Sequence, residues 1–497
     1  MLQGLLCLIY TGLFMFIILK WKLFKVKELP VGYILVAFVL KLLVGVFFWK
    51  VYVASYSIND ATAFYNDSKM LYDSFFESPS AFFKMFFGFD DPALVKYVSH
   101  MQSWSNDFNT FFINDARTMI RFNTLVRFFS FGFYSVHTIV ACFCSLIGLT
   151  LIYKAVVGLI ADKSFWLFII VFISPSLLFW SSGVFKESIV FVGMGMLLYH
   201  SEFGLKKKYS KTNSAGVLVG LFFMLNIKLY VLLAMVPGLL SNFWIARSKQ
   251  RNALIKYTAV SIFLVAALFT IPRLLPQYDL LKNLHDKQIT FNKMARGGVY
   301  LNAGNDHFIY VDYLQRNELL KYVSPNVYSL KDKVEYKEFK RNSSDTTTLI
   351  GINGTTFKVE VAIPPAGSSI YVKPVKTDLV GFLMSVPHAF LNTLLLPQLF
   401  KTLYSWKLVS LIANLGYLLF IFTALFFSKI KKEHAPYLLF ILSFVVVLFS
   451  LIGLTTPVLG AIVRYRVPAL PFLGILLLLL IDREKFERFF KKRKTEN

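Results

Sequence analysis

The stretch FWSSGVFKES (179–188) places a lysine and a glutamate side by side between two strongly apolar runs. LFIIVFISPSLL (167–178) precedes it directly, and IVFVGMGMLLY (189–199) follows it directly. A charge near the middle of a bilayer costs several kcal/mol unless it is paired or hydrated. Lys186 and Glu187 therefore need a physical reason to stand between two membrane-type runs, and that reason depends on which side of a membrane they face.

The composition indicates a polytopic membrane protein. The chain has 497 residues, and 56% of them are hydrophobic. Several apolar runs reach the roughly 20 residues that a helix needs to span a bilayer. The first run (5–19) is as short as that of a cleaved signal peptide, but no basic segment precedes it and no small-residue cleavage site follows it. We expect it to remain as a helix.

The net charge of +25 does not indicate nucleic-acid binding, because of where the basic residues lie. They form short clusters between apolar runs, which is typical of loops retained in the cytoplasm and of contact with anionic membrane lipids. The clusters are at 20–27, 206–211, 247–251, 429–432 and 483–494.

The sequence predicts an all-α membrane protein with about eleven transmembrane helices. Placing the basic clusters inside puts the N-terminus outside and the C-terminus inside, and the alternation holds at every cluster. Two long polar loops, 54–126 and 276–405, then both lie outside. We expect membrane helices in 1–274, an extracytoplasmic insert with an interfacial helix in 275–403, and further membrane helices with a basic tail in 404–497. The expected spans are 4–20, 31–53, 130–153, 164–182, 186–201, 213–227, 228–246, 254–273, 404–428, 435–455 and 460–481.

Local patterns refine this topology. The apolar segment 215–246 would be about 48 Å long as one helix, so we expect two helices that meet at Lys228. SAFFKMFFGF (80–89) is amphipathic and is expected to lie flat at the headgroups. The second outer loop alternates apolar and polar residues around Asn353-Gly354, which predicts a hairpin and a small β-containing insert. The segment 382–400 resembles a re-entrant or interfacial helix.

The ionisable residues that lie near apolar runs gather on the predicted outer face. Cations there suit a phosphate or pyrophosphate headgroup, and a nearby carboxylate suits proton transfer from an acceptor hydroxyl. The candidate catalytic residues are Asp60 and Glu187. The candidate substrate-binding residues are Lys186, Lys228, Arg464, Arg466, Asp67 and Tyr65.

Simpler interpretations stay open for each of these residues. Lys186 and Glu187 would suit the first turn of a helix as a cap. Lys228 would reach the interface by snorkelling. One of Arg464 and Arg466 would contact only headgroups, and an aspartate such as Asp60 is ordinary in a polar loop.

The chain contains no phosphate-binding Walker loop and no dinucleotide fingerprint. Its three cysteines, Cys7, Cys142 and Cys144, lie inside apolar runs, which predicts core thiols and no disulfide framework or metal-ligand spacing.

Three stretches resemble motifs of bacterial polysaccharide-biosynthesis membrane proteins related to GT-C glycosyltransferases: SPSLLFWSSGVFKES, NIKLYVLLAMVPG and GLTTPVLGAIVRYRVPALPF. The resemblance implies a polyprenyl-phosphate-linked sugar donor, used outside the cytoplasmic membrane, and a catalytic acid in the first outer loop, here Asp60. It does not cover 278–378. This chain also departs from the family by one additional N-terminal helix. Asn59 stands where many members carry a second acidic residue, which leaves use of a divalent metal open.

The predicted function is transfer of a sugar from a polyprenyl-phosphate-linked donor to a lipid or glycan acceptor, in the cytoplasmic membrane of a bacterium. The alternative enzyme is an O-antigen-type polymerase, whose loss would shorten chains to one repeat. A transporter or flippase is a third class, and it would need polar residues along the full membrane depth. Apart from Lys41, the inner halves of the predicted spans carry almost none.

Overall fold

The computed structural model describes most of the chain and divides it into two compact units. The first comprises Met1–Ser261, Pro397–Leu448 and Val467–Asn497, and the second comprises Ile262–Leu396 and Phe449–Arg466. The described residues are 1–26, 28–54, 59–89, 91–104, 115–206, 210–248, 252–304, 307–331, 335–340, 346–350, 356–370, 372–373, 375–376, 378–396 and 407–495.

Within the described residues, seven helical stretches are long and apolar enough to cross a membrane. The chain is therefore a multi-pass helical membrane protein, as the composition predicts. The count of eleven spans and the orientation stay predictions. The seven stretches are Leu2–Lys20 (α1), Val31–Val53 (α2, Val31–Phe48, with a π turn), Tyr134–Leu159 (α7, Tyr134–Val156, with a short turn), Leu229–Arg247 (α12), Ala253–Leu274 (α13), Lys432–Thr455 (containing α18, Ala435–Thr455) and Leu459–Leu480 (α19, Leu459–Tyr465, and α20, Leu470–Leu480).

Two apolar segments show how local sequence divides a long apolar run. The span expected at 164–182 consists of α8 (Ser164–Phe168), a π-helical turn and α9 (Pro175–Trp180). Pro175 lacks an N–H and disfavours the helical conformation of the residue before it, so α9 begins there. The segment 215–246 divides as expected, because α11 (Lys211–Ile227) ends and α12 begins on either side of Lys228.

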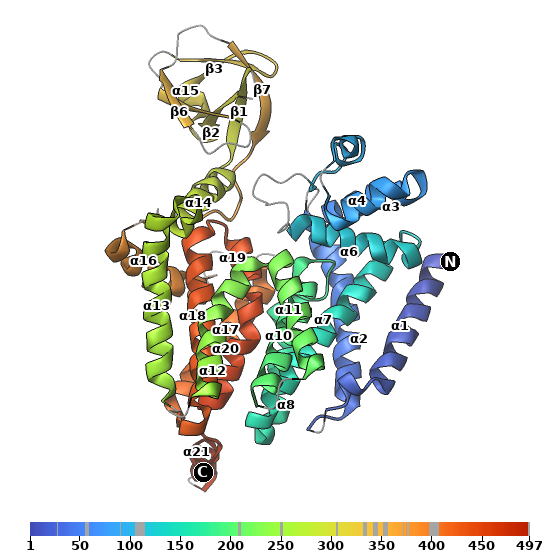
Figure 1. Ribbon diagram of the computed structural model, residues 1–497, viewed down its shortest axis with the longest axis vertical. Coiled ribbons are helices and arrows are strands. Elements are labelled where there is room, and N and C mark those ends of the chain that lie inside the picture. Colours follow the sequence, from blue (N-terminus) through green and yellow to red (C-terminus); the bar gives the residue numbers. More distant parts are fainter. Residues whose placement is uncertain are drawn as a thin grey trace. The chain divides into compact units, whose positions relative to one another are not determined.

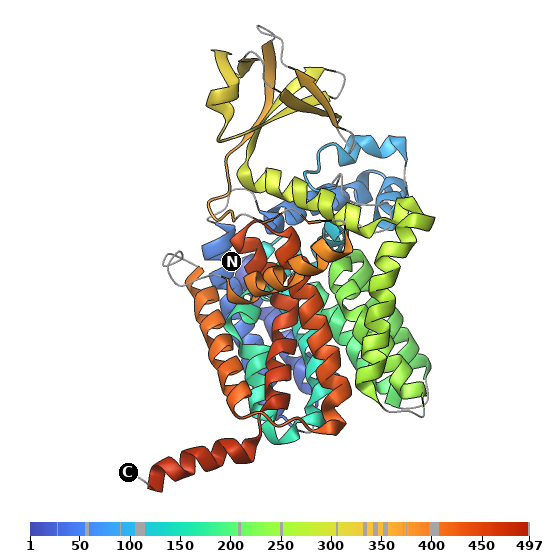
Figure 2. The same ribbon diagram turned by 90° about the vertical axis from the view of Figure 1, so that its left-hand side faces the viewer.

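The predicted first outer loop is largely helical. It contains α3 (Asp60–Glu77), α4 (Pro79–Phe87), α5 (Val95–Val98) and α6 (Asp115–Ser130). The amphipathic stretch 80–89 is α4, with Ser78 as N-cap, Pro79 in the first turn and Gly88 in the left-handed conformation at φ 82° as C-cap. In Figures 1 and 2, α3, α4 and α6 lie across one end of α1, α2 and α7.

The second unit contains the β-structure that the sequence predicts (Figure 1). Seven antiparallel strands form one sheet in the order β3-β4-β7-β1-β2-β5-β6. Its apolar core includes Val299, Leu301, Ile309 and Val311. The strands are β1 (Gly298–Gly304), β2 (His307–Asp312), β3 (Leu320–Ser324), β4 (Val327–Leu330), β5 (Glu335–Lys340), β6 (Thr346–Ile350) and β7 (Thr356–Ile363). The unit also contains α14 (Leu280–Arg296) and α16 (Leu379–Leu395).

The predicted hairpin around Asn353-Gly354 is wrong in its pairing. The turn itself lies outside the described residues, but the strands on either side of it are not partners. β6 pairs with β5, whereas β7 lies between β4 and β1. Phe357 and Val359 of β7 pack against the sheet core, and a central position gives β7 backbone partners on both edges.

Candidate functional site

The FWSSGVFKES stretch contains an interruption, 181–185, between α9 and α10 (Lys186–Lys206). Side chains of neighbouring helices bond the backbone oxygens of this interruption. Lys41 Nζ of α2 donates to the Ser181 carbonyl at 3.0 Å and to Ser181 Oγ at 2.6 Å. Ser145 Oγ of α7 donates to the same carbonyl at 2.8 Å. These bonds replace helical N–H donors, which allows non-helical backbone to lie among apolar helices.

Close backbone packing fixes the position of this interruption and of α10. A Cβ atom on Gly45 of α2 would lie 2.8 Å from the Ser182 carbonyl oxygen, closer than side chains tolerate. On the other side, a Cβ on Gly148 of α7 would lie 2.1 Å from the Phe191 carbonyl of α10. Glycine at such contacts lets helix backbones approach in a membrane bundle. The start of α10, with its two charges, is thus packed closely between α2 and α7.

Glu187 faces the interior of the first unit and pairs with Lys228. Lys228 Nζ donates to Glu187 Oε1 at 2.7 Å, and the two side chains are 3% and 0% exposed. Lys228 lies at the break between α11 and α12, where an extended backbone (φ −146°, ψ 75°) separates the helices. Two charges this deeply buried are tolerated because each neutralises the other. Lys228 is therefore buried in an ion pair, and its side chain does not extend to an interface as the snorkelling interpretation would require.

Lys186 faces a different direction from its neighbour Glu187, because successive helical residues are turned by about 100°. Its ammonium donates to Asp115 Oδ2 at 2.7 Å and lies 4.9 Å from the centre of the Phe64 ring. This second ion pair is more open than the first: the Lys186 side chain is 14% exposed and the Asp115 side chain 38%. Asp115 begins α6 and Phe64 belongs to α3, so three helices meet at Lys186.

Asp60 is the first residue of α3 and is exposed. Asn59 caps this helix, because its side chain accepts a hydrogen bond from Thr62 N at 3.0 Å. Asp60 and Phe64 are four residues apart, so their side chains lie on the same face of α3 about one turn from each other. Since the Phe64 ring contacts Lys186, the predicted base and one predicted substrate-binding residue belong to the same corner of the first unit.

Asp67 holds the loop that follows α5. Its two carboxylate oxygens accept hydrogen bonds from Gln102 N at 3.0 Å and Ser103 N at 2.7 Å. Burial raises the pKa of Asp67, and the two backbone N–H groups act against that rise by stabilising the carboxylate. These bonds give Asp67 an internal role, and its predicted contact with substrate stays a prediction.

Tyr65 is engaged within the same group of helices. Its hydroxyl donates to the Gly132 carbonyl, and the Arg127 guanidinium lies 4.2 Å from the centre of its ring. Arg127 Nη2 also donates to the Tyr65 carbonyl at 2.5 Å. Tyr65 therefore joins α3 to α6 and to the turn after α6, and its predicted role in substrate binding also stays a prediction.

Arg464 and Arg466 lie in the second unit, at the end of α19. Both are buried, at 8% and 2% exposed. Arg466 Nη1 donates to the carbonyls of Thr393 at 2.9 Å and Leu396 at 2.7 Å, at the C-terminus of α16. A guanidinium in this place satisfies carbonyls that the helix leaves without donors. The phosphate contacts predicted for the two arginines, and their placement beside Lys186, stay predictions.

Sequence reasoning missed the partners that α6 contributes. Asp115 directly follows FFIN (111–114) and belongs to no motif, so nothing in its local sequence set it apart. Arg117 and Arg121 are four residues apart, and both guanidinium groups lie over the Trp104 ring, at 4.9 and 5.6 Å from its centre. Burial and the charge of Arg117 lower the pKa of Arg121 to about 10. Arg117 and Arg121 would repel each other on an isolated helix, so this spacing is the sequence signal that a partner packs on that face of α6.

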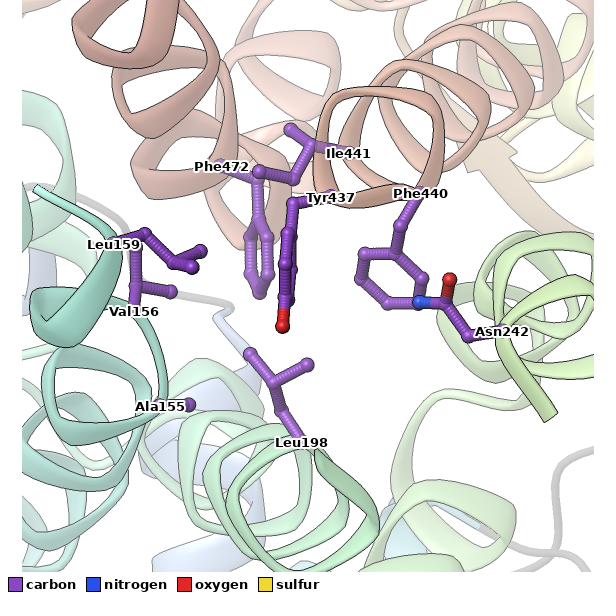
Figure 3. A pocket seen from close by; sticks show the side chains of 9 residues that line it. All are labelled: Ala155, Val156, Leu159, Leu198, Asn242, Tyr437, Phe440, Ile441 and Phe472. Carbon is purple, nitrogen blue, oxygen red and sulfur yellow. The ribbon is translucent and has the colours of Figure 1, made fainter. Parts of the chain in front are cut away.

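A small cavity of about 30 Å³ lies among α7, α10, α12, α18 and α20, away from these charges. Figure 3 shows Leu198, Phe440 and Phe472 around it, with the Tyr437 hydroxyl directed inward. Its walls are mainly apolar, and it contains none of the predicted site residues. Among the described residues, no group of three His, Cys, Asp or Glu side chains has the geometry to hold a metal ion.

The first unit thus brings four charges together at the start of α10, as the pairs Glu187–Lys228 and Lys186–Asp115, with Asp60 one helical turn from Phe64. Three of these residues, together with Asp60, were predicted from the sequence, and Asp115 was not. No family model matches this chain, and no curated protein and no solved structure matches it significantly.

Proposed function

We propose that this chain transfers a sugar from a polyprenyl-phosphate-linked donor to a lipid or glycan acceptor, on the outer face of a bacterial cytoplasmic membrane. The observation that supports this most is the shared corner of α3 and α10. An exposed carboxylate, Asp60, stands about one turn from the ring that contacts Lys186. Transfer from a phosphate-linked donor needs a base for the acceptor hydroxyl and a cation for the leaving phosphate.

Each charged residue has a distinct role in this proposal. Asp60 takes the proton of the acceptor hydroxyl as that oxygen bonds to the anomeric carbon and the bond from that carbon to the phosphate oxygen breaks. Lys186 stabilises the departing phosphate. Its 14% exposure favours it over Lys228, at 3%, for direct contact with a ligand. Glu187 and Lys228 position the start of α10 between them, and Arg464 and Arg466 remain candidate phosphate ligands from the second unit.

Lys41 supports an enzyme over a transporter. A transport path needs polar groups along the depth of the membrane helices, and Lys41 is the ionisable residue that stands out in that region of the sequence. Its ammonium is fully buried and bonded to Ser181 on the chain interruption. These bonds to the chain interruption account for the presence of Lys41 without a role in transport.

Deletion of the gene and an Asp60→Asn allele test this proposal in the bacterium that carries the chain. Both strains should lose the same sugar from a surface polysaccharide or glycolipid. Asp73→Asn is the matched control, because Asp73 lies on the same helix in an exposed pair with Lys69 at 2.5 Å. That strain should keep the wild-type glycan profile.

The glycan profile also separates the alternatives. Chains shortened to a single repeat in the deletion strain would instead identify a polymerase. An unchanged profile in the Asp60→Asn strain would remove Asp60 from the mechanism. Movement of a lipid-linked sugar across proteoliposomes without bond formation would contradict the transferase proposal and establish a transporter.

A further inference from the structure

We propose that the Lys186–Asp115 pair is an exchangeable anion site, in which a phosphate or pyrophosphate group displaces the Asp115 carboxylate from the Lys186 ammonium. Asp115 occupies the ligand position while the site is empty and leaves it when the ligand binds. The inference deepens the proposed function by naming the group that recognises the donor phosphate, and it rests on that function for the identity of the natural ligand.

The contrast between two neighbouring ion pairs carries the proposal. Glu187 and Lys228 are joined at 2.7 Å with side chains 0% and 3% exposed, so no ligand reaches either charge without unfolding the surroundings. Lys186 and Asp115 are joined at the same distance, yet their side chains are 14% and 38% exposed. Protein encloses both members of the first pair, whereas the carboxylate of the second pair has an open surface. Only the second is suited to exchange.

The lysine is held in place when the carboxylate leaves. Its ammonium lies 4.9 Å from the centre of the Phe64 ring, and the ring itself is buried. A cation over an aromatic face is attracted to it independently of any carboxylate. The ammonium therefore stays in place after Asp115 leaves. A phosphate oxygen then takes the position that Asp115 Oδ2 occupied.

The carboxylate is also stable after it leaves. Asp115 is the first residue of α6, a helix of 16 residues, and an acidic side chain in a first turn is stabilised by the positive helix end. At 38% exposure it turns to water without moving the backbone. A phosphate monoester or pyrophosphate carries more negative charge than one carboxylate and competes for the ammonium accordingly.

The test is equilibrium binding of radiolabelled inorganic pyrophosphate to the full chain in phosphatidylcholine nanodiscs. Asp115→Asn removes the competing carboxylate, so its affinity for pyrophosphate should rise about two- to fivefold, in line with the modest strength of partly exposed ion pairs. Lys186→Met should lose the specific binding. Asp73→Asn removes a carboxylate from the exposed Lys69–Asp73 pair of α3 and should leave the affinity unchanged.

A second set of nanodiscs contains phosphatidic acid, whose headgroup is a phosphate monoester. Competition with pyrophosphate in the wild type, absent in Lys186→Met, identifies a lipid headgroup as the ligand. Binding of pyrophosphate without that competition identifies a free or sugar-linked phosphate. In both cases the Asp115→Asn protein binds the phosphate ligand more tightly than the wild type.

An affinity that is unchanged or weaker in Asp115→Asn, in protein with the wild-type elution volume and thermal midpoint, would overturn the exchange. This arm does not depend on Lys186→Met folding. It also does not depend on sugar transfer. Tighter pyrophosphate binding by Asp115→Asn, with no sugar transfer by the wild type, would contradict the proposed function alone. Sugar transfer by the wild type, with no increase in the pyrophosphate affinity of Asp115→Asn, would contradict the exchange alone.

Discussion

Glu187 Oε1 and Lys228 Nζ lie 2.7 Å apart in the first unit, and both side chains are almost completely buried. The two residues are 41 positions apart in the chain. The pair ties the start of α10 to the break between α11 and α12, and it explains why an apolar chain keeps a glutamate directly after an interrupted helix.

Removing one partner of this pair should be strongly destabilising. Lys228→Met strands a buried carboxylate, which typically costs about 3–5 kcal/mol. Lys228→Met combined with Glu187→Leu leaves no stranded charge and should recover part of that loss. Thermal unfolding of the purified variants in detergent measures both. A double variant no more stable than the Lys228→Met protein would show that the pair does not account for these charges.

The Lys41 bonds predict a local effect on the interruption. Lys41→Met removes both bonds to Ser181, and the loss of hydrogen bonds from a buried charged donor costs about 1–3 kcal/mol. Lys50, exposed in the turn after α2, is the control, and Lys50→Met should change stability by less than about 0.5 kcal/mol. Equal effects of the two substitutions would contradict the assignment of Lys41 to the interruption.

Close packing of α2 predicts a difference between two of its glycines. Gly45→Ala puts a methyl group 2.8 Å from the Ser182 carbonyl, and overpacking of this kind costs about 1–3 kcal/mol. Gly32→Ala meets nothing within 4 Å and should be neutral or slightly stabilising, because alanine suits a helix better. The midpoint of thermal unfolding distinguishes them, and a Gly45→Ala protein as stable as wild type would disprove the close contact.

Asp67 predicts a pH dependence. Burial raises its pKa above the ordinary 3.8, so the folded protein binds this proton more tightly than the unfolded chain. The resulting stability is fully present below pH 3.8 and is lost as the pH rises through the raised pKa. The free energy of unfolding of the wild type relative to Asp67→Asn should therefore fall as the pH rises across this range. A difference that grows with pH would show that the backbone bonds outweigh burial.

Much of the architecture could be predicted because it depends on local pattern. The length of the apolar runs indicated a membrane protein. The length of the segment 215–246 predicted a helix break at Lys228, and the structure has the break there. The charges of the candidate site stood out for the same reason, since ionisable residues are rare beside membrane runs.

The pairing of those residues could not be predicted, because it depends on long-range packing. The Ser181 carbonyl that receives Lys41 is 140 residues away in the chain, and Asp115 is 71 residues from Lys186. The strand order could not be predicted either. A favourable turn sequence at Asn353-Gly354 predicted a hairpin, but β7 pairs with β1 and β4, and its partly buried Phe357 and Val359 pack against the sheet core.

The most direct test of the central proposal is sugar transfer by the purified chain in proteoliposomes, with labelled polyprenyl-phosphate-linked sugars and a lipid extract from the deletion strain as the source of acceptor. The wild type and Asp73→Asn should form labelled product at equal rates. Asp60→Asn should be slower by about 10²–10⁴-fold, the usual contribution of a general base, with an unchanged thermal midpoint. Product formation by Asp60→Asn at the wild-type rate would contradict the assignment of Asp60 as the base, and transfer by none of the three proteins would contradict the transferase itself.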